Sequence, residues 1–351
     1  MLLRDAEYNK ITIAEEYNKN ITILGRSGSG KSYMCQRFIG EMARKGARTI
    51  ALDFSVSYRE DQLIWKDNIA SIIKPYEGEF YYYINVKGED NFVYWVSTEL
   101  CKAMGINSFR QRGAFRSFCE TIYSEKGYIC IEDILKCAED TIEALIALKD
   151  DKEYIKIVDA LIMRLDEYRN VQIRFSNKKK CNSFKGNIHI IQLDRYPMRI
   201  RVMLTKFFMA IVFMEKRNGI GEGLYDYICL DEIQNIISSE STSIEGENGE
   251  LISLIRECRR FGLGTIISTQ YLNGFNKSLK SLLMQSGTRL LFRPTDSDIR
   301  ELATEIEHAH IKEWMDILLR LHRGEAILTG TYIVADRLKC TTPIVVTVEE
   351  E

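Results

Sequence analysis

Several features that would place the chain in a membrane or outside the cell are missing. Proline is scarce, with 4 residues among 351, and no proline-rich linker separates one region from another. No stretch reaches the roughly 18 consecutive apolar residues that a membrane-spanning helix needs. The first residues, MLLRDAEYNK, include acidic side chains where a signal peptide has a basic end followed by an apolar run. We therefore expect a cytoplasmic protein without a membrane segment.

Metal and redox motifs are missing as well. The nine cysteines include no C-x-x-C pair, and no histidine lies near them at metal-binding spacing. Reduced, packed thiols are the expected state of these residues. The net charge is only -2, so a nucleic acid partner would have to bind to a local basic patch. The 45% hydrophobic content supports one large core or two modest ones.

The centre of the chain differs in pattern from its two ends. Residues 20 to 55 alternate strand, glycine loop, helix and strand, which predicts a βαβ crossover whose second strand ends at Asp53. From about residue 93 to 174 the apolar residues recur with a helical period. Strand patterns then return in the segments 187–193, 225–231, 264–269 and 288–293.

This alternation predicts an α/β fold with a mostly parallel, doubly wound sheet, flanked by helices and interrupted by an all-α insertion. The expected organisation has three segments. They are residues 1–92 for the first part of the core, 93–180 for the insertion and 181–351 for the second part of the core.

A glycine-rich stretch lies between the first strand and its helix. The residues GRSGSGKS, 25 to 32, fit the pattern G-x-x-x-x-G-K-[ST]. Its glycines let backbone amides turn inward around a polyphosphate, Lys31 can reach the β- and γ-phosphates, and Ser32 can ligate Mg²⁺. A flexible turn that carries lysine and serine by chance is the alternative. The candidate nucleotide-binding residues are Gly25, Arg26, Ser27, Gly28, Ser29, Gly30, Lys31, Ser32 and Tyr33, and the cofactors are ATP and Mg²⁺.

Two adjacent acids end a later strand, about 200 residues beyond Lys31. In YDYICLDEIQNI, Asp231 can hold the Mg²⁺ shell, while Glu232 can take a proton from the attacking water. Adjacent carboxylates at a buried strand end repel unless a cation neutralises them. The alternative is that they cap the next helix. No N-K-x-D signature and no L-S-G-G-Q-like signature occurs, which disfavours GTPase-like and ABC-type proteins.

The glycine loop, the strand ALDF, YICLDEIQNI, RECRRFGLGTIISTQ and SGTRLLFR together resemble the HerA/FtsK branch of RecA-like motor ATPases, which includes the conjugative ATPases of type IV secretion. The resemblance covers residues 20 to 55 and 187 to 335. It implies a RecA-like core in a ring, usually a hexamer, with ATP sites between subunits and a central channel that handles DNA. The barrel domain usual in HerA proteins is not expected here, because fewer than twenty residues precede the first strand.

The same resemblance implies roles for four further residues. Asp53 matches an acid near the attacking water, and Gln270 matches a polar sensor of the γ-phosphate. Arg259 and Arg260 match arginines near the subunit boundary, where one could stabilise phosphoryl charge on a neighbour's ATP. Physical alternatives remain open, because a glutamine can simply cap a strand and an arginine can form surface ion pairs.

DNA contacts are the least specific expectation. Basic candidates are Arg164, Arg169, Arg174, Lys178, Lys179, Lys180, Arg199 and Arg201. Such residues would neutralise phosphates, although a run of charge is commonly a solvated surface. The aromatic stretch FYYYINV, 80 to 86, could stack on bases, but core packing is the favoured interpretation.

Three functions are therefore compared. The first is a ring-shaped, Mg²⁺-dependent ATPase that moves DNA or remodels a nucleoprotein complex, with a partner protein such as a nuclease or secretion component on another chain. The second is a nucleotide-gated scaffold with slow turnover that regulates such a partner. The third, a small-molecule kinase, lacks any acceptor signature.

Overall fold

The computed structural model describes most of the chain, in two compact units. The described residues are 3–14, 18–55, 57–58, 63–64, 70–148, 152–178, 186–219, 224–238, 252 and 255–349. The first unit, here called the core unit, comprises Met1–Ile72, Lys185–Ile191 and Gly223–Glu351. The second, here called the helical unit, comprises Ile73–Phe184 and Gln192–Glu222. Among the described helices, none combines the length and the apolar content that crossing a bilayer requires.

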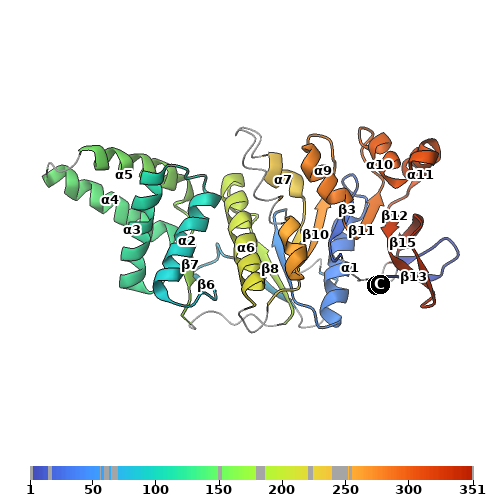
Figure 1. Ribbon diagram of the computed structural model, residues 1–351, viewed down its shortest axis with the longest axis horizontal. Coiled ribbons are helices and arrows are strands. Elements are labelled where there is room, and N and C mark those ends of the chain that lie inside the picture. The colour runs from blue at the N-terminus through green and yellow to red at the C-terminus, as the bar shows by residue number, and fades with distance from the viewer. Residues whose placement is uncertain are drawn as a thin grey trace. The chain divides into compact units, whose positions relative to one another are not determined.

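Five neighbouring strands of the core unit are parallel (Figure 1). In spatial order they are β11 (Thr288–Phe292), β3 (Ile21–Leu24), β10 (Gly264–Thr269), β9 (Tyr227–Leu230) and β4 (Thr49–Asp53). Nearly every side chain in them is buried, as expected for a parallel sheet covered on both faces. The α/β prediction is therefore confirmed, with these parallel strands at the centre of the sheet.

The register of these strands brings their carboxyl ends to one edge. Leu24 of β3 pairs with Thr269 of β10, Ile267 pairs with Leu230 of β9, and Leu230 also pairs with Leu52 of β4. The residues that follow each strand therefore start from the same edge, which is where ligands bind in open α/β sheets.

The same sheet continues on either side of the parallel strands. Beyond β4 follow β8 (Ile188–Gln192) and β5 (Ala70–Ile73). Beyond β11 lies an extension whose described strands all pair in antiparallel fashion. Its strands are β12 (Glu325–Gly330), β15 (Ile344–Val348), β1 (Leu3–Arg4), β2 (Lys10–Ile13), β13 (Tyr332–Val334) and β14 (Leu338–Cys340). The extension thus pairs a strand near the start of the chain with one near its end.

The helices of the core unit cover this sheet. They are α1 (Lys31–Arg44), α7 (Ile233–Ser238), η3 (Arg259–Phe261), α9 (Lys277–Met284), α10 (Ile299–Ile306), η4 (His308–His310) and α11 (Ile311–Arg320). On α1 the apolar positions Met34, Phe38, Ile39 and Met42 are all buried, as their spacing predicts. They join a core with strand residues such as Ile23, which fixes the start of α1 beside the end of β3.

The helical unit contains the helices expected in the insertion. They are α2 (Glu89–Ala103), α3 (Phe109–Lys126), α4 (Ile131–Leu148), α5 (Lys152–Leu165) and the short η2 (Asp166–Tyr168), joined by α6 (Met198–Asn218). The unit also has a small parallel sheet of β6 (Phe80–Tyr83) and β7 (Ile173–Ser176). It is therefore not entirely helical, contrary to the expectation of an all-α insertion.

The boundaries of the helical unit also differ from the expected 93–180. Tyr82 of β6 packs on Phe208 of α6 with ring centroids 5.0 Å apart, and Phe175 of β7 packs on Phe207 at 4.7 Å. These aromatic contacts join α6 to the unit across many residues of sequence, which local periodicity does not reveal. Phe80 and Tyr82 are buried, in agreement with the core-packing interpretation of this aromatic stretch.

Candidate nucleotide-binding site

The glycine loop joins the end of β3 to the first turn of α1. Gly28 and Gly30 have φ angles of 76° and 112°, a region that side chains with a Cβ rarely occupy. At Gly25 an added Cβ would lie 2.5 Å from Cβ of Phe292 on β11. Glycine is thus required at Gly28 and Gly30 by backbone conformation and at Gly25 by close packing.

Backbone hydrogen bonds hold this loop against three parts of the sheet. The amide of Gly25 donates to the carbonyl of Thr269 at 3.3 Å, and that of Arg26 donates to Arg293 at 2.9 Å. The amide of Gly324, just before β12, donates to the carbonyl of Ser29 at 3.2 Å. The antiparallel extension therefore helps to shape the loop, a contribution that the local sequence pattern does not indicate.

Lys31 is buried at the start of α1, although it is a lysine. Its Nζ donates to the carbonyl of Arg26 at 3.1 Å, so the side chain folds back over the loop. Burial lowers its pKa, while the nearby charges of Asp231 and Glu232 raise it in opposition. The Lys31 ammonium therefore interacts electrostatically with Asp231 and Glu232, the two acids that the sequence analysis placed in the same site.

Asp231, which directly follows β9, forms hydrogen bonds to α1 and to the neighbouring strand β10. Its Oδ2 accepts a hydrogen bond from Ser32 Oγ at 3.1 Å, and its Oδ1 accepts from Ser268 Oγ on β10. Asp231 is 1% exposed. The two residues proposed as metal ligands, Ser32 and Asp231, thus lie in direct contact.

Glu232 has a left-handed backbone, with φ of 56°, which is uncommon for a residue with a side chain. Its amide donates to Asp231 Oδ1 and to Ser268 Oγ, each at 3.1 Å, and these bonds hold the turn. Its Oε1 accepts from Gln270 Nε2 at 2.8 Å, and its Oε2 accepts from Asn235 Nδ2 at 2.9 Å. Both carboxylate oxygens are therefore bound by amide side chains.

Asp53, at the end of β4, is fully buried and bound by backbone amides. Its Oδ1 accepts from Ser55 at 3.3 Å and from Ser57 at 2.9 Å, and its Oδ2 accepts from Tyr58 at 3.2 Å. Burial raises its pKa to about 6, although these amides lower it in opposition. The loop that Asp53 holds brings Ser57 Oγ to 3.5 Å from Ser32 Oγ.

The remaining predicted residues lie at different places. Arg26, Ser27 and Gly28 are exposed on the loop. The Tyr33 hydroxyl donates to the carbonyl of Glu349 at 3.2 Å, so this hydroxyl is directed to the chain end after β15. Arg259 and Arg260, in η3, are exposed, and no described hydrogen bond or ion pair connects either to the loop, Asp231 or Glu232.

The hydroxyl of Ser29 supports the binding of a phosphate at the glycine loop. Its Oγ is buried without a hydrogen-bond partner in the described structure, an arrangement that is costly unless a ligand completes it.

Within the described residues, no group of three or more His, Cys, Asp or Glu side chains is arranged to hold a metal. A Mg²⁺ ion at Ser32 and Asp231 would then depend on phosphate oxygens and water, which is its usual mode of binding in such sites.

Sequence reasoning missed four polar residues in this site. They are Ser57, Gln234, Asn235 and Ser268. Ser268 lies two residues before Gln270 on β10, and Asn235 lies three residues after Glu232, one helical turn away. These spacings are the signals that could have identified both.

Most basic residues considered for DNA contact are paired within the helical unit. Arg169 binds Glu139 at 2.6 Å and Asp166 at 2.8 Å, and Arg174 binds Glu79. Lys178 lies 3.3 Å from Glu89, and Arg199 binds Glu167. The last two described candidates donate to backbone carbonyls: Arg164 to Gly105, and Arg201 to Asp194 and Tyr196.

Lys179 and Lys180 lie outside the described residues. Four of the other candidates form ion pairs, and the remaining two donate to backbone carbonyls, so each described candidate already has a partner within the chain.

A strand, a glycine loop that opens a helix, a buried lysine and an acid at the end of another parallel strand of the same sheet define the class of P-loop NTPases. Residues 9–212 match the family described as "Helicase HerA, central domain", which is more than half of the 351-residue chain. The chain therefore belongs to this family of P-loop ATPases.

The sequence of one characterised protein is also similar to that of this chain. The chain is 21% identical over 331 residues to the DNA double-strand break repair helicase HerA of Sulfurisphaera tokodaii, covering 90% of this chain. It spans only 63% of that protein's length.

Solved structures share its fold. VirB4 of Thermoanaerobacter pseudethanolicus aligns with a TM-score of 0.66 and 14% identity, over 100% of this chain and 96% of that chain. The plasmid coupling protein TrwB in complex with ADP and Mg²⁺ aligns with a TM-score of 0.60 and 12% identity, over 93% and 85%. The RecA-like fold of these proteins is therefore the fold of this chain.

Proposed function

We propose that this chain hydrolyses ATP with Mg²⁺ as one subunit of a ring. The observation that supports this most is the continuous set of contacts from Ser32 through Asp231 and Ser268 to Glu232 and Gln270. It joins the phosphate-binding helix to two further strand ends, which is the arrangement that hydrolysis of a bound triphosphate requires.

Each residue then has a distinct role. The loop amides from Gly25 to Gly30, with Lys31, bind the phosphates, and Ser32 and Asp231 hold Mg²⁺, whose charge neutralises the transferred phosphoryl group. Glu232 takes the proton of the attacking water. Gln270 responds to the γ-phosphate through its bond to Glu232. Asp53 positions the loop that carries Ser57 beside Ser32.

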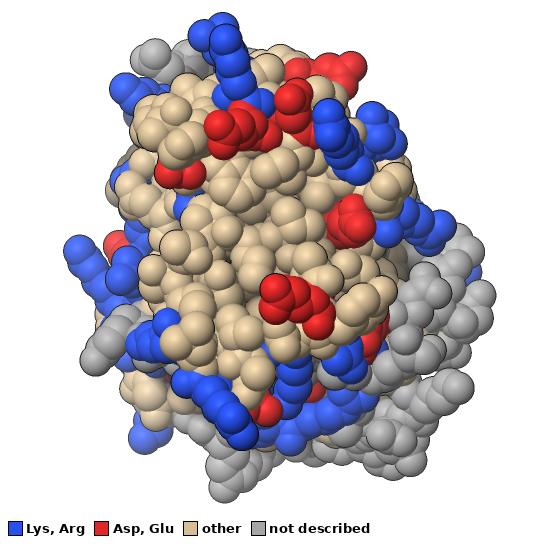
Figure 2. All heavy atoms as spheres, turned by 90° about the vertical axis from the view of Figure 1, so that its right-hand side faces the viewer, with Lys and Arg blue, Asp and Glu red and all other residues tan. Residues whose placement is uncertain are grey.

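The ring is proposed because Arg259 and Arg260 are exposed, and no hydrogen bond or ion pair among the described residues joins either to the site of its own chain. One of them would complete the ATP site of a neighbouring subunit, and the ring would be a hexamer, as the family resemblance implies. Figure 2 shows one face of the core unit whose middle is mostly uncharged. Depletion of charge is typical of the centre of a protein interface, which is consistent with subunit contact there.

The work of the ring would be to move DNA or to remodel a nucleoprotein complex together with a partner protein. The similarity to a protein named as a DNA repair helicase supports this substrate. DNA would contact residues other than the paired basic side chains of the helical unit.

A nucleotide-gated scaffold is the second candidate, and one observation favours it. Both oxygens of Glu232 are occupied by Gln270 and Asn235, so the proposed base is restrained before it can accept a proton. Slow turnover would follow unless nucleotide, DNA or a neighbouring subunit released it.

Steady-state ATPase assays with and without duplex or single-stranded DNA separate the two functions. The motor predicts strong stimulation by DNA that Lys31→Ala abolishes, with Lys45→Ala on exposed Lys45 as the matched control. The scaffold predicts a slow rate that DNA does not change. If calorimetry on folded protein detected no binding of any nucleoside triphosphate with Mg²⁺, both functions would be rejected. Phosphoryl transfer to an acceptor other than water would instead identify a kinase.

A further inference from the structure

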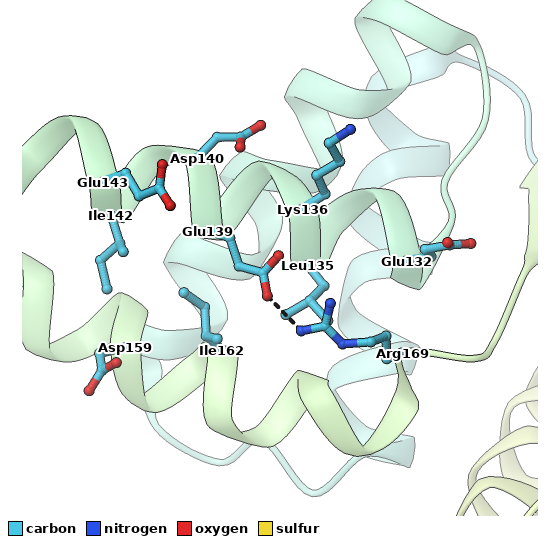
Figure 3. Close-up of a pocket in the computed structure, with 10 residues that line it drawn as sticks. All are labelled: Glu132, Leu135, Lys136, Glu139, Asp140, Ile142, Glu143, Asp159, Ile162 and Arg169. Atoms are coloured by element: carbon cyan, nitrogen blue, oxygen red, sulfur yellow. Dashed lines mark hydrogen bonds and ion pairs between the residues drawn. The ribbon is translucent and has the colours of Figure 1, made fainter.

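A groove on the helical unit has no part in the proposed ATPase reaction. It lies between α4 and α5 and has a volume of about 570 Å³ (Figure 3). Figure 3 shows Ile142 of α4 and Ile162 of α5 pointing toward each other across it. Leu135, one of the buried residues of α4, also lines the groove.

The apolar part of the groove continues along α4. Ile146 follows Ile142 by four residues and so lies on the same helix face, and its side chain is 58% exposed. Leu148 at the end of α4 is 75% exposed and Met163 on α5 is 70% exposed. Ile146 and Leu148 lie together in the last turn of α4. Exposed large apolar side chains beside a groove are typical of a surface that binds another protein.

The polar lining of the groove is mainly acidic. Its five carboxylates are Glu132, Glu139, Asp140, Glu143 and Asp159. Only two cations, Lys136 and Arg169, accompany them, and Arg169 is bound to Glu139 (dashed line in Figure 3). Among the described residues, no ion pair involves the other four carboxylates. The groove therefore has negative charge that the described part of the chain does not neutralise.

Two other ligands fit these features less well. A nucleic acid would bring phosphates against carboxylates, and the contact would be repulsive. A metal ion requires converging ligands, and the described residues contain no group of three or more carboxylate, histidine or cysteine side chains so arranged. The apolar side chains Leu135, Ile142 and Ile162 in the lining also provide no ligand atoms for a cation.

We propose that the groove binds a basic amphipathic helix of a partner protein. Apolar side chains spaced three and four residues apart on that helix would contact Ile142, Ile146 and Ile162, as in other helix-in-groove interfaces. Lysine or arginine side chains on its flanks would pair with Asp140, Glu143 and Asp159, and this charge complementarity would select the partner. The proposal does not depend on ATP hydrolysis.

The test uses the full chain and a fluorescent 18-residue peptide with leucines on one helical face and lysines on the other. A second peptide has the same composition in an order that does not place leucines on one face. Anisotropy titration should show at least about tenfold tighter binding of the amphipathic peptide, because one well-buried apolar side chain contributes roughly that much.

Two variants locate the site. The double variant Asp140→Lys with Glu143→Lys should weaken peptide binding about tenfold, because two attractions become two repulsions. Ile146→Asp should weaken it by about the same factor through the apolar contact. Glu120→Lys, on exposed Glu120 of α3 outside the groove, is the matched control and should change affinity less than about twofold. Circular dichroism verifies folding of each variant.

Three outcomes would overturn the proposal. Equal affinity for the two peptides, or an equal loss with Glu120→Lys, would indicate general attraction between opposite charges. Weaker binding of duplex DNA to the double variant would identify a nucleic acid site. Conversion of an oligomer to monomers by the double variant, measured by sedimentation, would identify a second copy of this chain as the occupant.

Discussion

Charged residues are arranged in opposite ways in the two units. In the core unit Lys31, Asp53 and Asp231 are buried at the ends of parallel strands or at the helix that follows one. In the helical unit Arg169 and its partners Glu139 and Asp166 are exposed by a third or more. Buried charges are costly unless neighbouring groups or a ligand compensate them, whereas exposed ion pairs contribute about 0–1 kcal/mol. Function is therefore indicated by where a charge is buried, and not by how many charges adjoin in sequence.

Because charges in the site of the core unit are buried, small changes to side chains there should have large effects on ATP hydrolysis. Glu232→Gln keeps the size of the side chain and removes its ability to accept a proton. Hydrolysis should fall by up to about 10⁴-fold, the range for loss of a general base, while ATP and Mg²⁺ still bind. Single-turnover rates with parallel calorimetry measure both quantities. Glu257→Gln, on exposed Glu257, is the control, and wild-type turnover in Glu232→Gln would remove this residue from its role.

The arginines of η3 differ from the buried charges of the core unit, because they are exposed yet are predicted to be catalytic. Replacing Arg259 and Arg260 by alanine should reduce ATP hydrolysis on the order of a thousandfold, if one of them stabilises phosphoryl charge. Arg256→Ala is the neighbouring exposed control. Mixing the double variant with Lys31→Ala should restore part of the activity, because mixed rings combine an intact loop with an intact arginine. No recovery at any ratio, with assembly verified, would exclude action between subunits.

The buried carboxyl of Asp53 should make the stability of the folded chain depend on pH. Its pKa rises from 3.8 to about 6 in the folded chain because the carboxyl is buried. Between about pH 4 and 6 the folded chain therefore holds a proton that the unfolded chain has released, so this residue lowers stability as pH rises through that window. The melting temperature of wild type minus that of Asp53→Asn should decrease between pH 4 and 7, by roughly a few degrees. A constant difference would show that Asp53 does not titrate in this range.

The sequence was sufficient to predict the elements that form the site. Gly25, Asp53, Asp231 and Gln270 each end or follow an apolar run, and buried parallel strands place such positions at a common edge. Contact between Ser32 and Asp231 follows from that geometry. The role of Gln270 as a sensor stays a prediction, although its side chain does reach Glu232.

Other features depend on contacts that no local pattern encodes. The left-handed backbone of Glu232 depends on Ser268, which comes from another strand. Gly324 reaches the glycine loop from the antiparallel extension. The helical unit includes α6 because its phenylalanines pack on β6 and β7. Each of these is a long-range contact, and periodicity describes only neighbours along the chain.

The smallest expected effect concerns the exposed charges of the helical unit. Arg169→Ala removes an arginine that is 51% exposed and bound to Glu139 and Asp166. Stability should fall by about 0–1 kcal/mol, and DNA affinity should change less than about twofold, because the charge is already paired. Glu139→Gln is the matched variant, since it disrupts one of the two ion pairs and leaves the arginine in place. If Arg169 instead bound a phosphate, Arg169→Ala would lower the slope of log affinity against log salt by about one, whereas Glu139→Gln would not lower it.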